Sequence, residues 1–168
     1  MIRPQLLVIA ASIMLAHAAP SALAAAPAAT VSAQNPLLKA SPLPFQMPQF
    51  GLIKDEHYAP AFAEGMKRQL AEVNAIANNR QPATFENTIV ALERTGQLLH
   101  RVQSIFGNMT STNTNSVLEA VEVDVSPKLA AHGDAIALNP KLFARIDTLY
   151  AKRDKLGVDA ESLRLLER

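Results

Sequence analysis

The fold of this chain is decided by residues 55–77, DEHYAPAFAEGMKRQLAEVNAIA. Large apolar side chains recur there at steps of three and four residues, at Tyr58, Phe62, Met66, Leu70 and Val73. This spacing places them on one face of an α-helix. Asp55 is suited to cap the helix, and Pro60 is tolerated because it lies near the first turn. The stretch therefore predicts a long amphipathic helix.

A second helix follows the same pattern. Asn78 to Pro82 should end the first helix, and Thr84 can cap the next, with Glu86 in its first turn. The buried side of this second helix is expected to carry Phe85, Ile89, Leu92, Leu99, Val102, Phe106 and Met109. Gly96 lies inside it at a cost of ~1 kcal/mol relative to alanine, so we interpret Gly96 as a site of close packing.

Further helices are expected beyond a polar break at residues 110–116. One begins near Asn115, and Pro127 should kink or restart it. Asn139-Pro140 is a capping residue followed by a first-turn proline. The helix that follows should bury Leu142, Phe143, Ile146, Leu149 and Tyr150 and carry Lys152, Arg153 and Lys155 in its last turns, with Gly157 as its C-terminal cap. Asp159 opens a last helix, so residues 53–168 are predicted to form an all-α, multi-helix domain.

The first 26 residues resemble a signal peptide. Arg3 supplies a positive start, an apolar run follows from Leu6 to Ala16, and small residues come next at the spacing used for cleavage. The run is too short to span a bilayer. We expect export to the periplasm, with no membrane association after the leader is removed; the alternative is a buried N-terminal helix.

Residues 27–52 form a Pro- and Ala-rich segment, which we expect to be extended because proline lacks an N–H donor and restricts φ. Its second half also carries Phe45, Met47 and Phe50. A free linker has little use for such side chains. We therefore expect this segment to lie across a folded surface.

Composition excludes several functions. The 168 residues suit one domain, and 49% of them are hydrophobic. Sixteen basic residues face fifteen acidic ones, and Arg3 falls in the predicted leader, so the mature chain is neutral. A nucleic-acid partner is not expected, because such proteins carry a basic surplus. The absence of cysteine excludes disulfides and thiolate zinc ligands.

The histidines outside the leader do not form a metal motif. His57, His100 and His132 lie far apart in sequence, and the pattern H-E-x-x-H is absent. We interpret each as a surface or interface histidine, with His57 in a capping position.

The pairs of acidic residues indicate a functional site no more specifically than the histidines do. Glu86 and Glu93 share one predicted helix face, as do Glu119 and Glu122, and both pairs are typical of solvated faces. No catalytic, cofactor-binding or metal-binding residue is assigned.

The order of several short motifs resembles a known family. These motifs are Asn35-Pro-Leu-Leu, Leu43-Pro-Phe, His57-Tyr58, Pro60-Ala-Phe62, Glu64-Gly-Met66, Phe85-Glu-Asn-Thr-Ile89, Gly96-Gln-Leu-Leu99, Met109-Thr-Ser111, Leu142-Phe-Ala-Arg145 and Glu161-Ser-Leu-Arg-Leu165. Their order and spacing from about residue 35 onward are similar to the start of bacterial peptidyl-dipeptidases. These belong to the thimet-oligopeptidase-like zinc metallopeptidases, which include oligopeptidase A.

The resemblance implies a longer, mostly helical enzyme whose N-terminal region forms part of the wall of a deep channel. That enzyme removes C-terminal dipeptides from short peptides. It uses a zinc-bound water and a downstream H-E-x-x-H helix. His57 and His100 do not match that motif, so no zinc role transfers to this chain.

Three hypotheses follow. The first is that the chain is the N-terminal part of a periplasmic zinc peptidyl-dipeptidase, inactive and zinc-free by itself because the catalytic segment is missing. The second is a non-enzymatic periplasmic helical module that binds peptides or a partner. In the third, the chain docks onto a separately encoded catalytic segment.

Overall fold

The computed structural model describes residues 34–167, and the predicted signal peptide lies outside them. Helices and short helical turns make up the described secondary structure, which confirms the all-α class. The α-helices are α1 (Tyr58–Ala77), α2 (Ala91–Glu93), α3 (Gln97–Thr112), α4 (Ser116–Ala137), α5 (Pro140–Tyr150) and α6 (Ala160–Glu167). The shorter turns are η1 (Pro36–Leu38), η2 (Pro44–Gln46), η3 (Phe50–Leu52), η4 (Asp55–His57), η5 (Phe85–Val90) and η6 (Arg153–Lys155).

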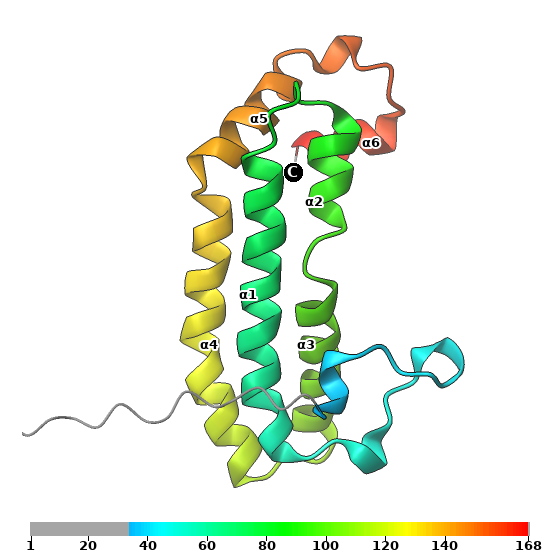
Figure 1. Cartoon of the computed structure of the whole chain (residues 1–168), viewed down its shortest axis with the longest axis vertical. Coiled ribbons are helices and arrows are strands. Elements are labelled where there is room, and N and C mark those ends of the chain that lie inside the picture. Colours follow the sequence, from blue (N-terminus) through cyan, green and yellow to red (C-terminus); the bar gives the residue numbers. More distant parts are fainter. Residues whose placement is uncertain (1–33, 168) are drawn as a thin grey trace, which may run out of the picture.

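Helix α1 is the centre of the bundle. Figure 1 shows α1 between α4 on one side and α3 on the other. The Phe106 ring of α3 meets the rings of Tyr58 and Phe62 edge-on, with centroids 5.1 and 5.2 Å apart. A Cβ atom at Gly65 would lie only 3.0 Å from the Leu99 Cα, so glycine permits this close approach of α1 to α3. The first predicted helix and its buried face are therefore confirmed.

The start of α1 differs from the prediction. Asp55 does not cap it, because the single turn η4 precedes α1. His57 stands at the N-terminal boundary of α1, but its side chain caps η4, because its Nδ1 accepts the Lys54 N–H at 3.0 Å. The Asp55 carboxylate accepts the Asn115 amide at 2.9 Å and so ties η4 to the start of α4.

The second predicted helix is interrupted, so its expected continuity through Gly96 was wrong. The π-helical turn η5 leads into α2, and α3 starts afresh after Gly96. Gly96 has φ of +72°, in the left-handed region that ends a helix. Its N–H donates to the Glu72 carboxylate of α1 at 2.8 Å, so a contact between elements holds the break. The cap at Thr84 is confirmed, because its hydroxyl accepts the Asn87 N–H.

Helix α4 begins where predicted. The Asn115 side chain accepts the N–H groups of Val117 and Leu118. Pro127 does not restart the helix, which runs without a break across it. Proline has no N–H to donate to the carbonyl four residues earlier, which belongs to Val123. Val123 is 77% exposed, so water can donate a hydrogen bond to this carbonyl.

The polar break before α4 is shorter than expected. Helix α3 continues to Thr112, although residues 110–112 were predicted to lie outside it. The hydroxyls of Ser111 and Thr112 donate to the carbonyls of Gly107 and Asn108, within the same helix. These hydroxyls share carbonyl groups four residues earlier in the helix, an arrangement that is compatible with helical backbone.

Helix α5 begins at the predicted cap, because the Asn139 side chain accepts two first-turn N–H groups. Its buried face differs from the prediction: Phe143 and Tyr150 are exposed, whereas Arg145 is buried. The helix ends at Tyr150, so the predicted basic last turn lies beyond it, in and before η6.

The last helix docks on the bundle. Asp159 caps it by accepting the Ser162 N–H at 2.7 Å, and hydrogen bonds from Ser162 lower the pKa of this carboxyl. Leu166 is buried with Ile89 and Leu149. Gly157 has φ of +65° and lies between η6 and α6, so it does not cap α5.

The Pro-rich segment is described from residue 34 onward and is not continuously extended. Three single turns, η1 to η3, interrupt it, and proline occupies the first position of η1 and η2. Asn35 and Leu37 are buried against the bundle. Phe45, Met47 and Phe50 are exposed instead of lying across a folded surface, because only the start of the segment is held by the described helices. Figure 1 shows the rest as a projection beside α3.

Candidate functional site

The three histidines outside the leader have different settings. His57 accepts a backbone hydrogen bond in η4, His100 is exposed on α3, and His132 is 8% exposed on α4. Of the two alternatives, surface or interface histidine, the first holds for His100, whereas His132 is buried where α4 packs against α1. Across residues 34–167, no three His, Asp or Glu side chains come close enough together to hold a metal ion.

His132 belongs to a polar network inside the bundle. Its Nε2 lies 2.7 Å from the Gln69 Oε1 of α1. An amide oxygen can only accept a hydrogen bond, so the His132 Nε2 is the donor. The buried Nδ1 then carries the lone pair, and it has no hydrogen-bond partner among residues 34–167. Burial lowers the pKa of His132, which keeps the ring neutral. The Gln69 amide also approaches the Thr95 hydroxyl at 3.5 Å, so the network joins α4, α1 and the break before α3.

Arg145 is a second buried polar centre. Its guanidinium donates to the backbone carbonyls of Asn79 and Gln81 at 2.8 and 3.0 Å. It also donates to the side chains of Asn87 and Thr88 at 2.8 and 3.1 Å. These acceptors are all neutral, and they belong to the loop after α1 and to η5. Arg145 therefore holds that connection against α5.

Arg101 lies at the base of the Pro-rich segment. Its Nη2 donates to the Leu37 carbonyl at 3.2 Å, which ties η1 to α3. Burial, and to a smaller extent the nearby Arg68, lowers the pKa of the Arg101 guanidinium. A partly open cavity of about 270 Å³ lies beside it and is lined mainly by the Pro-rich segment, including Lys39 and Gln49. The arginine thus supports the end of the segment at η1.

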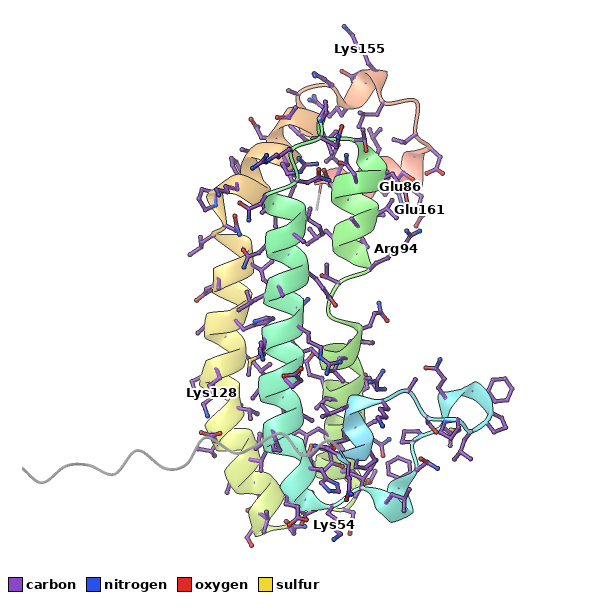
Figure 2. The ribbon with its side chains drawn as sticks, viewed as in Figure 1. Lys54, Glu86, Arg94, Lys128, Lys155 and Glu161 are labelled. Carbon is purple, nitrogen blue, oxygen red and sulfur yellow. The ribbon has the colours of Figure 1, made fainter. Side chains whose placement is uncertain are left out.

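The acidic residues singled out in the sequence lie on the surface. Glu86, Glu93, Glu119 and Glu122 are all exposed. Glu86 pairs with Arg94 at 3.2 Å, and Figure 2 shows both on the side of the molecule away from α1. The expected solvated faces are confirmed. Among residues 34–167, no helix combines the length and the apolar character needed to cross a bilayer.

No functional or structural role was predicted from the sequence for Gln69, Arg101 or Arg145, and the burial of His132 was not predicted. Helical spacing carried a usable signal in two cases. His132 lies at steps of three and four from Leu129 and Ile136, and Arg145 lies three residues after Leu142. Both positions therefore fall on apolar faces. Their hydrogen-bond partners come from other elements, which the spacing does not reveal.

The geometry defines a helical scaffold. The buried polar side chains that the structure places together, around Gln69 and around Arg145, hold breaks and connections between helices in position. No protein-family profile matches the chain.

The chain is similar to two curated proteins named dipeptidyl carboxypeptidase. It is 46% identical over 137 residues to the protein of Escherichia coli strain K12, a match that covers 82% of this chain and 20% of that protein. It is 47% identical over 133 residues to the protein of Salmonella typhimurium strain LT2, covering 79% of this chain and 20% of the relative. The resemblance to bacterial peptidyl-dipeptidases is confirmed. The chain spans about a fifth of the length of these relatives.

Proposed function

We propose that this chain forms the N-terminal part of a zinc peptidase that removes C-terminal dipeptides from short peptides. One observation carries the proposal: the identity of 46–47% to dipeptidyl carboxypeptidases over about four-fifths of the chain. The described residues do not fit a zinc site, since no cluster of His, Asp and Glu is present among them. The proposal therefore assigns zinc and the catalytic groups to the part of the enzyme that this chain does not match, and no catalytic step to this chain.

The contribution of this chain is structural. Its helices form part of the wall of a channel that admits short peptides, as the family resemblance implies. The proposal includes a signal peptide over residues 1–26, a Pro- and Ala-rich segment over 27–52 and a helical domain over 53–168. Arg3 and the apolar run after it support export to the periplasm.

A segment exchange tests this function. In the E. coli dipeptidyl carboxypeptidase, the 137-residue matched stretch is replaced by the corresponding stretch of this chain. We expect the chimera to bind one equivalent of zinc and to release C-terminal dipeptides from a short synthetic peptide. The readout is dipeptide release followed by chromatography, with the metal content measured in parallel.

The control is the same enzyme with the stretch deleted, which should be inactive because part of the channel wall is absent. A chimera without dipeptide release would contradict the proposal. If the isolated chain then also unfolded cooperatively, the alternative of a periplasmic helical binding module would be favoured.

A further inference from the structure

Residues 40–53, which we call the apolar arm, expose an unusual amount of apolar surface. The exposed fractions are 101% for Phe45, 59% for Leu52, 55% for Met47, 43% for Phe50 and 42% for Leu43. The arm contains no Asp, Glu, Lys or Arg. In Figure 2 it stands out beside α3. A concentrated apolar surface of this kind marks an interaction site.

The arm has a defined conformation. At its base, Leu37 is buried and its carbonyl accepts a hydrogen bond from Arg101. At its far end, Ile53 packs against the core. Backbone hydrogen bonds close the turns within the arm, such as the 2.9 Å bond from Gln46 N–H to the Leu43 carbonyl. Prolines 42, 44 and 48 further restrict it. A preorganised surface loses little conformational entropy on binding.

The backbone at the tip of the arm is strained. Phe45 and Gln46 both have φ of +55°, a region that bulky L-residues rarely adopt. Such strain persists where surrounding contacts impose it. The fully exposed Phe45 ring has no such contacts within the described bundle. The turn itself is closed by hydrogen bonds from the Gln46 and Met47 N–H groups to the Leu43 and Pro44 carbonyls, and it presents the Phe45 ring to solvent.

We propose that the apolar arm is the docking surface for the remaining part of a dipeptidyl carboxypeptidase, and this inference rests on the proposed function. The match covers only 20% of each relative, so most of such an enzyme lies outside it and is available to cover the arm. The lack of cations argues against an anionic membrane surface, which basic residues recognise. The arm binds the rest of the enzyme by burying its aromatic and aliphatic side chains.

Cysteine accessibility tests the docking surface. Because the chain has no cysteine, a Phe45→Cys variant gives the isolated chain one thiol. The same substitution is placed in the chimera, and maleimide labelling at this position is followed by peptide mass spectrometry. We expect labelling to be at least about tenfold slower in the folded chimera than in the isolated chain, and to recover in denaturant. A Leu52→Cys variant repeats the test at a second exposed position.

A Lys155→Cys variant is the matched control, because Lys155 is exposed at the end of the bundle away from the arm (Figure 2). It should label at similar rates in both proteins. The docking surface is overturned if the chimera is active and its Phe45→Cys variant labels as fast as that of the isolated chain. It is also overturned if this variant labels no more slowly than the Lys155→Cys variant of the active chimera. Either result leaves the proposed function standing. An inactive chimera rejects both.

Two further outcomes assign the arm to a different occupant and would also overturn the proposal. One is protection in the isolated chain that grows with its concentration, which indicates a second copy. The other is protection on adding phosphatidylcholine vesicles, which indicates a membrane surface.

Discussion

Single residues decide where the helices of this bundle break. Gly96 separates α2 from α3 for two reasons: its φ is +72°, and a Cβ atom there would lie 2.4 Å from the Gln69 side chain. The close packing at Gly96 was predictable from the sequence, whereas the break in the helix was not. The left-handed conformation depends on Glu72, whose carboxylate accepts the Gly96 N–H from another helix.

Replacing Gly96 with alanine should lower the free energy of unfolding by about 1–3 kcal/mol, because alanine pays for the positive φ and displaces Gln69. Urea unfolding followed by circular dichroism measures this change. Gly133→Ala is the control, since Gly133 lies within α4 and its Cβ would meet no atom within 4 Å. That control should raise stability by about 0.5–1 kcal/mol. Equal effects of the two substitutions would contradict our account of Gly96.

His132 should make stability depend on pH. Burial lowers its folded-state pKa below the ordinary 6.5. As the pH falls below about 6.5, the unfolded chain takes up a proton that the folded ring does not, so the free energy of unfolding decreases. The decrease develops between pH 6.5 and the lowered pKa, with a slope of at most about 1.4 kcal/mol per pH unit. Urea unfolding between pH 7.5 and 5 measures it.

The control for this pH dependence is a pair of variants. His132→Gln should flatten the slope, whereas His100→Gln should leave it unchanged because His100 is exposed on α3. A slope that survives His132→Gln would show that other groups cause it.

At the scale of elements, the connections depend on buried polar contacts as much as on apolar faces. Thr84 and Asn139 were predicted as capping residues, and helices were predicted to begin near Asn115 and at Asp159; all four side chains accept first-turn N–H groups. Caps were predictable because the capping side chain and the N–H group that donates to it lie two or three residues apart in sequence. The Arg145 contacts join residues that are 57 to 66 positions apart in sequence, so no local sequence pattern predicts them.

Arg145→Met should destabilise the chain by about 3 kcal/mol, because it removes four hydrogen bonds and leaves the carbonyls after α1 without donors. Thermal and urea unfolding both report this loss. The matched control is Arg94→Met, where an exposed ion pair with Glu86 is lost and the expected change is below about 1 kcal/mol. Similar losses for the two variants would mean that the guanidinium of Arg145 is not the anchor of this connection.

At the scale of the whole molecule, the purified chain should hold well under one equivalent of zinc and release no dipeptides. The reason is that residues 34–167 bring no three His, Asp or Glu side chains together. Metal analysis by mass spectrometry and a peptide-hydrolysis assay measure both properties, with the chimera as the positive sample. Stoichiometric zinc in the isolated chain would overturn the assignment of the metal to the remainder of the enzyme.

Local patterns along the chain were enough to predict the helical class, the starts of η5, α4, α5 and α6, and the family resemblance. Apolar periodicity and capping involve residues that are only a few positions apart, so both can be recognised in the sequence alone. Only the tertiary structure decided that His132 and Arg145 are buried, that Gly96 breaks a helix, and that Phe45 is exposed. The physical reason is that burial and strain depend on what the other elements place beside a residue, and those neighbours lie far away along the chain.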